Sequence, residues 1–305
     1  MLTTVKQEIA FVGTGLHSGR PVRMIVRPAA TGGLRFRRTD VTDRDNVIPA
    51  RYDLVNDTRL NTRLTNAAGV SVSTVEHLMA AFAGTGVWNA VIDIDGPEVP
   101  IMDGSAARFV QKIVAAGLRQ LPGPRRAIRV LDAVRVQQGE AWAEISPAPV
   151  LRIGFEIDFA DKAIGRQAKA MDIVNGVFVR ELSDCRTFCR RADVEAMQAA
   201  GLALGGSLDN AIVVEGAEVL NPEGLRRSDE FVRHKMLDAL GDLALAGAPI
   251  LGAYRGHRAG HGVTNALLRK LFATEGAWAE TAVAPDTARL LPGAGVVEAD
   301  LRRAG

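Results

Sequence analysis

The segment FVRHKMLDALGDLALAG, residues 231–247, has the apolar pattern of a buried helix that ends at Gly247. Three polar residues, His234, Asp238 and Asp242, interrupt this pattern at intervals of four. At 3.6 residues per turn their side chains lie within an arc of about 80° on one side of the helix. Whatever fold this chain adopts must therefore place an imidazole and two carboxylates along one face of a largely apolar helix. Metal ligation and acid–base catalysis are two chemical uses of such a face.

The composition indicates a globular protein with enough residues for two domains. The chain has 305 residues, of which 47% are hydrophobic and 24% charged. Its formal net charge of +2 gives no reason to expect a nucleic acid as partner. The N-terminal residues MLTTVKQEIA do not resemble a signal peptide, and no stretch approaches the roughly 20 uninterrupted apolar residues of a membrane helix. The only two cysteines, Cys185 and Cys189, favour a reducing compartment, so we expect a cytoplasmic protein.

Strand and helix patterns occur in blocks rather than in regular alternation, which predicts two α+β domains. Two prolines and a glycine in LPGPRR, residues 121–126, mark the boundary between them. We therefore expect an N-terminal domain over 1–122, a C-terminal domain over 127–285 and a C-terminal tail over 286–305.

The local patterns predict the main elements of each domain. The first domain is expected to hold two strands within 8–28, a helix over 71–84, a strand over 90–95 and a helix within 101–117. Ser73 and Glu76 match a capping box at the start of the first helix, and Gly84 is expected to end it. For the second domain the pattern predicts strands over 128–136 and 151–159, and helices over 191–200, 229–246 and 264–273.

A histidine and an aspartate four residues apart place two metal-capable groups on adjacent turns of one helix face, as His234 and Asp238 do. Catalytic zinc typically takes three protein ligands and keeps one position for water. His77 is the natural third ligand because it follows Glu76, and hydrolytic zinc sites commonly pair a ligand with a nearby carboxylate base. Two other interpretations stay open at this point: a surface ion pair between His234 and Asp238, and a Glu76 that only completes the capping box.

Asp242 lies one turn past Asp238, too far along the helix to share the metal easily. A carboxylate there can orient a histidine from another segment, and His261, in the glycine-flanked loop RAGHGVTN, is a candidate. An aspartate can keep such a histidine protonated as a general acid, because the carboxylate stabilises the imidazolium. The alternative is that His261 is a loop histidine without a catalytic role.

Six motifs of this sequence together resemble those of the UDP-3-O-acyl-N-acetylglucosamine deacetylases, the LpxC family: VSTVEHLMAA, PIMDGSA, CRTF, LGGSLDNAIVV, DEFVRHKMLDALGDL and a later GH. The resemblance runs in order from about residue 4 to 282. It implies a zinc enzyme that removes the N-acetyl group of UDP-3-O-(3-hydroxyacyl)-N-acetylglucosamine, the committed step of lipid A biosynthesis. It also implies a fold of two similar domains, each layering a sheet against helices, with the active site between them.

The same resemblance implies the metal and the substrate. The ion is Zn²⁺, with Fe²⁺ as the alternative in the cell, and its ligands are His77, His234 and Asp238. We expect a monomer that binds the UDP-3-O-acyl-N-acetylglucosamine substrate. A catalytically silent binding protein would be expected to lose a ligand or Glu76, and this chain has kept them all. The alternative function is that of a zinc amidohydrolase acting on another N-acetylated sugar.

The resemblance also assigns the catalytic roles. Glu76 is implied as the base that takes the proton of the attacking water, and His261 as the acid that protonates the leaving amine. Asp242 orients His261. Lys235 helps to position the substrate and stabilise charge, and Thr187 of the CRTF motif donates to the developing oxyanion.

Residues that bind the nucleotide are implied in the same way. Phe159 resembles the family position that stacks on uracil, with Glu156 and Asp158 nearby on the polar face of the strand; the alternative for Phe159 is a place in the core. Arg258 stands where family members commonly carry lysine near the diphosphate, and either cation suits that position.

The acyl end of the substrate is expected to meet Phe188 and the segment 191–204. Two positions depart from the family pattern. Arg190 stands where the family often has an aromatic residue that walls the acyl passage, and Asn61 stands where many relatives have a cysteine close to the metal. The loop GTGLHSG lacks dinucleotide-binding spacing and no helix is expected after it, but its His17 is expected to line the site.

Overall fold

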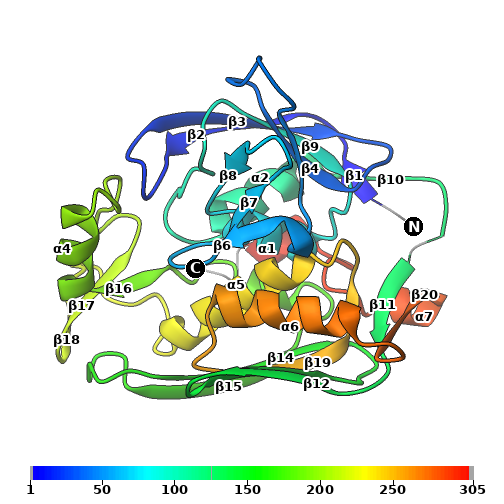
Figure 1. Cartoon of the computed structure of the whole chain (residues 1–305). Helices are drawn as coiled ribbons and strands as arrows, with labels where there is room; N and C mark the ends of the chain where they lie inside the picture. The colour runs from blue at the N-terminus through cyan, green and yellow to red at the C-terminus, as the bar shows by residue number, and fades with distance from the viewer. Residues whose placement is uncertain (1–2, 125, 302–305) are drawn as a thin grey trace.

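The computed structural model describes residues 3–124 and 126–301 of the chain. Two β-sheets form the outer layers, and helices fill the space between them (Figure 1). This mixed arrangement confirms the α+β fold predicted from the blocks of strands and helices. Every described sheet takes all its strands from one side of residue 125, which itself lies outside the described residues. This supports our proposal that the two domains divide at 121–126.

The first half of the chain builds the upper sheet of Figure 1 and the two helices beneath it. The strand order is β2-β3-β9-β4-β5, and the bounds in that order are Ile9–Thr14, Pro21–Pro28, Ala90–Ile94, Leu34–Arg38 and Val47–Pro49. The helices are α1 (Glu76–Thr85) and α2 (Ala107–Ala116). The shorter elements are β1 (Thr3–Val5), β10 (Leu118–Gln120), the 3₁₀ turn η1 (Tyr52–Leu54), β6 (Val55–Asp57), β7 (Arg63–Thr65) and β8 (Ser71–Val72).

The second half builds the lower sheet and the remaining central helices. The strand order is β12-β13-β19-β11-β20, with bounds Val134–Gln138, Ala141–Ser146, Ile250–His257, Arg126–Val130 and Trp278–Ala282. Two further strands extend this sheet: β14 (Leu151–Asp158) pairs with β19, and β15 (Arg166–Asp172) pairs with β14. The helices are α3 (Val177–Glu181), α5 (Glu230–Ala244) and α6 (His261–Ala273).

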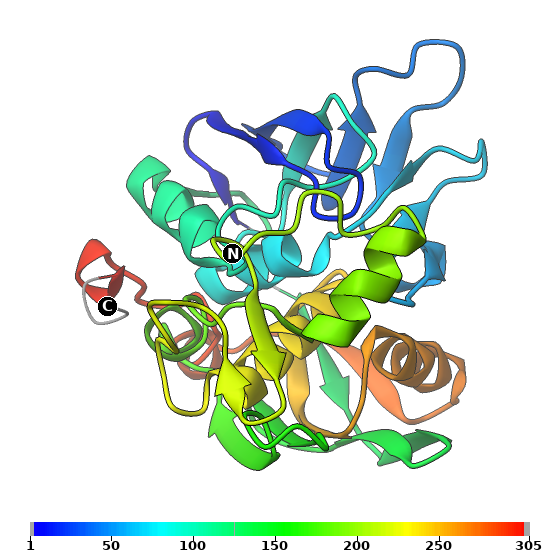
Figure 2. The same ribbon diagram turned by 90° about the vertical axis from the view of Figure 1, so that its left-hand side faces the viewer.

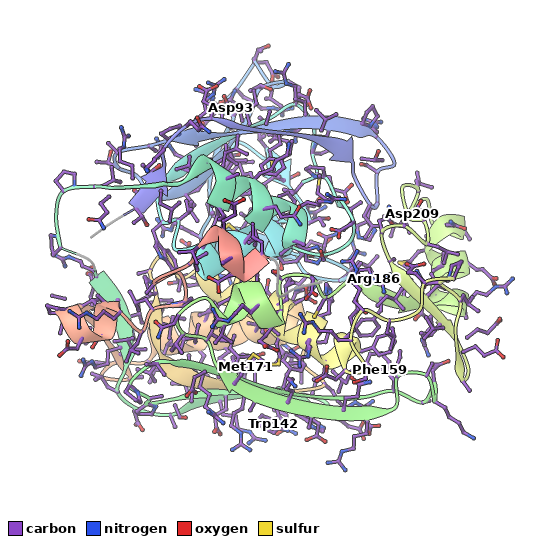
Figure 3. All side chains as sticks on the ribbon, turned by 180° about the vertical axis from the view of Figure 1, so that it is seen from behind. Asp93, Trp142, Phe159, Met171, Arg186 and Asp209 are labelled. Atoms are coloured by element: carbon purple, nitrogen blue, oxygen red, sulfur yellow. The ribbon has the colours of Figure 1, made fainter. Side chains whose placement is uncertain are left out.

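An additional small unit lies at one side of the molecule, between the levels of the two sheets. Figure 2 shows it facing the viewer, with its single helix in front. It consists of β16 (Phe188–Arg190), α4 (Arg191–Ala199), β17 (Ile212–Glu215) and β18 (Glu218–Val219). Figure 3 marks the two outer layers by Asp93 of β9 and Trp142 of β13, which lie at opposite edges of that view. The site described below lies between these layers.

Helices α1 and α5 cross closely in the centre of the molecule. A Cβ atom at position 241 would lie 2.0 Å from the carbonyl oxygen of Glu76, so the two backbones can approach only because residue 241 is glycine. One continuous cluster of buried apolar side chains runs through both halves and includes Leu78 of α1 and Leu237 of α5. The crossing therefore brings the first residues of α1 against the polar face of α5.

The strand predicted over 151–159 is confirmed as β14, whose Leu151, Ile153, Phe155 and Ile157 are all buried. The helix predicted over 229–246 is confirmed as α5. The chain after β2 forms a loop and then β3, so no helix follows GTGLHSG.

Four details of the predicted elements are wrong. Ser73 and Glu76 form no capping box, because the Ser73 hydroxyl donates to the Pro97 carbonyl and the Glu76 carboxylate accepts the peptide N–H of Thr62. The bounds of the helix predicted over 71–84 are also wrong, because Ser71–Val72 form β8 and α1 begins at Glu76. Helix α1 continues through Gly84 and ends before Gly86, whose φ of 85° is the left-handed conformation typical of a helix end.

The other two corrections concern segment boundaries. The strand predicted over 128–136 is two strands, β11 and β12, because the peptide N–H groups of Leu131 and Asp132 turn away to the carbonyl of Ala277. The helix predicted over 264–273 begins at His261, so this histidine lies in the first turn of α6 rather than in a loop.

The chain beyond β20 turns back across the helices. It contains α7 (Pro285–Ala288) and α8 (Glu298–Leu301), and α8 packs against α2 and α3. Asp300 pairs with Arg180 of α3 at 2.8 Å. Of the predicted tail, residues 302–305 lie outside the described residues. Within the described ranges, every helix is too short or too polar to cross a membrane.

Candidate metal centre and active site

Three side chains from two helices meet at the α1–α5 crossing. His77 is the second residue of α1, and His234 and Asp238 lie one turn apart on α5. One ligand atom of each lies within 4.8 Å of the other two, and all three residues are buried. His77 Nε2 and His234 Nε2 lie 3.5 and 3.3 Å from Asp238 Oδ1. The structure thus brings together the three residues that the sequence proposes as metal ligands.

The donor set fits a cation. Asp238 Oδ1 is buried and has no hydrogen-bond partner in the described part of the chain, although buried polar atoms normally have one. Two imidazole nitrogens and a carboxylate oxygen are a ligand set typical of zinc in hydrolytic enzymes. Burial opposes ionisation of Asp238, yet the Lys235 ammonium, which donates to Asp238 Oδ2 at 2.7 Å, helps to hold the pKa of this carboxyl well below its usual range.

A backbone carbonyl fixes the orientation of His234. Its Nδ1 lies 3.0 Å from the carbonyl oxygen of Cys185, which can only accept, so Nδ1 carries the proton and Nε2 has a free lone pair toward Asp238. Burial lowers the pKa of His234 to about 3, against the opposing effect of Asp238. A neutral imidazole with an unprotonated Nε2 is the form that binds metal.

A second group of polar residues lies beside the proposed metal ligands. His261 Nδ1 donates to Asp242 Oδ2 at 2.8 Å, and His261 Nε2 lies 4.0 Å from Glu76 Oε1. Burial alone would lower the pKa of His261, but the carboxylates of Asp242 and Glu76 raise it to about 9. Burial raises the pKa of Glu76, against the effects of His261 and His77. A carboxyl group and an imidazole, each with a raised pKa, therefore face each other across a short gap.

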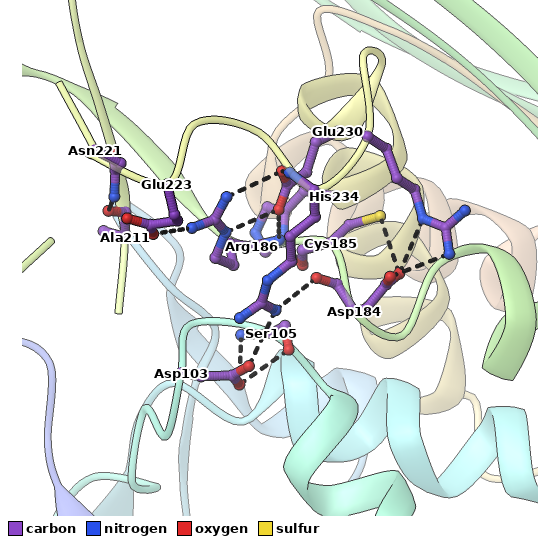
Figure 4. Close-up of polar contacts among 12 residues, drawn as sticks. Asp103, Ser105, Asp184, Cys185, Arg186, Ala211, Asn221, Glu223, Glu230 and His234 are labelled. Atoms are coloured by element: carbon purple, nitrogen blue, oxygen red, sulfur yellow. Dashed lines mark hydrogen bonds and ion pairs between the residues drawn. The ribbon is translucent and has the colours of Figure 1, made fainter. Parts of the chain in front are cut away.

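The peptide group that joins Cys185 to Arg186 is itself held by a buried ion pair between Arg186 and Glu230, drawn in Figure 4. Arg186 is 1% exposed and Glu230 is fully buried. Glu230 Oε1 accepts both the peptide N–H of Arg186, at 2.9 Å, and its Nε–H, at 3.0 Å. The Arg186 guanidinium also donates to the carbonyl of Gly224 and pairs with Glu223. The sequence interpretation missed Arg186 and Glu230, since neither has the spacing of a ligand or a catalytic group.

A cleft of about 730 Å³ opens from the metal ligands toward α4. Among the residues proposed to act on or bind substrate, those that line it are Glu76, Thr187, Lys235, His261, His17, Phe159, Phe188 and Arg258. Phe159 and Phe188 meet edge to face with ring centroids 5.6 Å apart. Phe159 is half-buried just beyond the end of β14, so it has a core side and a cleft side.

Two proposed nucleotide contacts lie away from the lining of the cleft. Glu156 pairs with Arg166 at 2.6 Å on the neighbouring strand, and Asp158 is exposed at the end of β14. Arg258 does line the cleft, in a left-handed conformation with φ of 50°, and its guanidinium donates to Glu140. The roles of these three residues stay predictions.

The departures from the family pattern and His17 also line the cleft. Arg190 pairs with Asp193 at 2.7 Å, which leaves its aliphatic stem along the wall. Asn61 Oδ1 accepts the peptide N–H of Thr74, the second residue before Glu76. Both ring nitrogens of His17 are buried without a partner among the described residues, and burial lowers its pKa.

Comparison with known proteins identifies the family of this chain. The family model described as "LpxC: UDP-3-O-acyl N-acetylglycosamine deacetylase" matches residues 2–273. Three similar relatives carry the name UDP-3-O-acyl-N-acetylglucosamine deacetylase. That of Phenylobacterium zucineum strain HLK1 is 51% identical over 286 residues, which cover 93% of this chain and 98% of the relative. Those of Pasteurella multocida strain Pm70 and Shewanella frigidimarina strain NCIMB 400 are 47% and 44% identical over 278 residues, with at least 90% of each chain covered.

Proposed function

Because this chain belongs to the UDP-3-O-acyl-N-acetylglucosamine deacetylase family, the LpxC family, we propose that it hydrolyses the N-acetyl group of UDP-3-O-(3-hydroxyacyl)-N-acetylglucosamine. The products are acetate and the free amine, and the reaction is the committed step of lipid A biosynthesis. The observation that carries this proposal is the buried set His77, His234 and Asp238 beside the facing pair Glu76 and His261. We place the reaction in the cytoplasm. We also propose that a single chain is the active unit, because one chain supplies both the proposed metal ligands and the Glu76–His261 pair.

The proposed cofactor is one Zn²⁺ ion, with Fe²⁺ as the alternative. His77, His234 and Asp238 would hold it. When bound, such an ion polarises the acetamide carbonyl and makes water more acidic. The remaining chemistry belongs to residues of the chain.

Glu76 takes a proton from water as the water oxygen forms a bond to the acetamide carbon. The carbonyl oxygen becomes an oxyanion, to which the Thr187 hydroxyl donates and beside which Lys235 places its charge. His261 then gives its proton to the amide nitrogen as the C–N bond breaks, because an amine leaves readily only when protonated. Asp242 holds the His261 ring in place by accepting the N–H at its other nitrogen.

The cleft supports a substrate with two different ends. Phe159 and Arg258 are proposed to meet the uridine diphosphate end, with Glu156 and Asp158 further out on the same strand. Phe188, His17 and the α4 segment are proposed to meet the acyl chain, since the wall of the cleft there includes apolar side chains such as Val194 and Met197.

The test is acetate release from the UDP-3-O-acyl sugar by zinc-loaded protein. We expect turnover that chelation abolishes and limited Zn²⁺ restores. His77→Ala, His234→Ala and Asp238→Ala should each lower the bound zinc measured by elemental analysis, whereas His257→Ala, at a histidine outside the site, should not. Full zinc content in all three ligand variants would refute the ligand set. Equal kcat/KM on the sugar nucleotide without its acyl chain would favour the alternative, an amidohydrolase for another N-acetylated sugar.

A further inference from the structure

Thr62 lies in the loop before β7 and is 1% exposed. All three of its polar groups bond to the elements of the active site. Its peptide N–H donates to Glu76 Oε2 at 3.0 Å, and its hydroxyl donates to Asp242 Oδ1 at 2.6 Å. Its carbonyl accepts the peptide N–H of Val75, the residue just before α1, at 3.4 Å. Thr62 therefore touches the helix that carries the base and the helix that carries the partner of the acid.

The two carboxylates that Thr62 contacts each divide their oxygens between two tasks. Oδ1 of Asp242 accepts from Thr62, while Oδ2 accepts from His261 Nδ1. Oε2 of Glu76 accepts from Thr62, while Oε1 lies nearest to His261 Nε2. A carboxylate rotates about a single bond, so a donor that fixes one oxygen also fixes the direction of the other. Glu76 and Asp242 are both buried, and a buried carboxylate oxygen requires such a donor.

We propose that Thr62 is a positioning residue that holds the base Glu76 and the Asp242–His261 pair in one rigid array. Its hydroxyl sets the direction in which Asp242 presents Oδ2, and thereby the direction in which His261 presents Nε2. Its peptide N–H donates to Oε2 of Glu76 and leaves Oε1 free to take the proton. This role rests on the proposed deacetylation, because it assigns Thr62 to the base and the acid of that reaction.

The hydroxyl group is the part of Thr62 that substitution can test, because every residue except proline keeps the peptide N–H. Thr62→Val removes the hydroxyl and keeps the shape, and Thr62→Ser keeps the hydroxyl and removes a methyl group. Thr85→Val is a matched control at the far end of α1. Thr85 is also 1% exposed, and its hydroxyl donates at 2.6 Å to the carbonyl of Ala81 rather than to a site residue.

We expect the kcat of zinc-loaded Thr62→Val to fall roughly 10- to 100-fold, as is typical when a residue that orients a reacting group is lost. KM and zinc content should stay within about 2-fold of wild type, because Thr62 contacts no proposed metal ligand and does not itself line the cleft. Thr62→Ser should recover most of the loss, and Thr85→Val should keep the wild-type kcat. If Thr62→Val does not fold, Thr62→Ala provides the same comparison. Equal kcat in Thr62→Ser and Thr62→Val, or a wild-type kcat in Thr62→Val, would overturn the proposal.

A second measurement separates this inference from the proposed function. The His261 Nδ1 proton, identified by its loss in His261→Ala, gives an NMR signal whose position depends on the hydrogen bond to Asp242. We expect this signal to move in Thr62→Val and to keep its position in Thr62→Ser and Thr85→Val. An unmoved signal in Thr62→Val would overturn the inference even if wild type is an active deacetylase. A moved signal supports it even if wild type releases no acetate, in which case only the proposed function fails.

Discussion

Three side chains of the proposed site each take their direction from a residue on a different element. His234 is held by the carbonyl of Cys185, Glu76 by Thr62, and His261 by Asp242. Spacing within one helix predicted the alignment of His234, Asp238 and Asp242, because that geometry is local. No local pattern identifies Thr62 or Cys185, whose contacts join residues 14 and 49 positions apart in the chain.

The Asp242–His261 pair predicts a pH effect. Asp242 raises the pKa of His261, and the acid must be protonated, so activity should fall as pH rises through that pKa. Asp242→Asn removes the negative charge while keeping the shape, so the alkaline limb of kcat/KM should move to lower pH. The check is the pH profile of zinc-loaded wild type and variant. An unmoved alkaline limb would contradict the role of Asp242.

Glu76→Gln tests the base without changing its size. The amide cannot take a proton, so kcat should fall roughly 10²- to 10⁴-fold. Zinc content should stay that of wild type, since Glu76 is not a proposed ligand. Glu280→Gln, at an exposed position of β20 outside the cleft lining, is the control and should keep full kcat. Near-normal turnover in Glu76→Gln would transfer the role of base to another group.

At the scale of elements, strict periodicity predicted well and local composition predicted poorly. The alternation in 151–159 gave β14 because one face of that strand is buried. The start of α6 was missed because glycines flank His261, and glycine disfavours a helix on its own. Packing of α6 against α5 and η1 outweighs that preference. The capping box also failed because of a tertiary contact: the Glu76 carboxylate accepts the peptide N–H of Thr62 instead of bonding within its own helix end.

The crossing of α1 and α5 predicts the effect of Gly241→Ala. The added methyl group would lie 2.0 Å from the carbonyl oxygen of Glu76, so the helices must move apart. We expect the free energy of unfolding to fall by about 1–3 kcal/mol. Zinc binding should also weaken, because both helices carry proposed ligands. Gly154→Ala is the control, since its nearest new contact is an ordinary 3.6 Å to Ala170. Chemical denaturation and zinc titration measure the two effects.

The buried Arg186–Glu230 pair predicts a coupled loss of stability and metal affinity. Glu230→Ala leaves the Arg186 guanidinium buried without its main partner, which typically costs about 3–5 kcal/mol. The same change removes the acceptor for the Arg186 peptide N–H, so the adjoining Cys185 carbonyl is less firmly held. Because this carbonyl orients the proposed ligand His234, zinc affinity should fall as well. Arg191→Ala breaks only exposed pairs, with Glu195 and Glu215, and should change stability by less than about 1 kcal/mol. Equal unfolding midpoints for the two variants would contradict this account.

For the molecule as a whole, the chain beyond β20 connects parts that are distant in sequence. A Cβ atom at position 293 would lie 2.3 Å from the backbone nitrogen of Gly86, at the end of α1, and Asp300 pairs with Arg180 of α3. Gly293→Ala should therefore separate this segment from α1 and lower the melting temperature. The proposed ligands and catalytic residues are distant from this contact, so kcat at low temperature should be unchanged. A melting temperature equal to that of wild type would show that the contact contributes little.

The division of the proposed ligands between α1 and α5 has a consequence during synthesis. More than 150 residues separate His77 from His234, and translation at roughly 5–20 residues per second leaves about 8–30 s between their appearances. Throughout that interval the nascent first half carries His77 without the other two proposed ligands. The ion can be captured in its full coordination only after α5 has emerged from the ribosome and docked on α1. With the proposed ligand set, metal acquisition is therefore a late event in the maturation of each molecule.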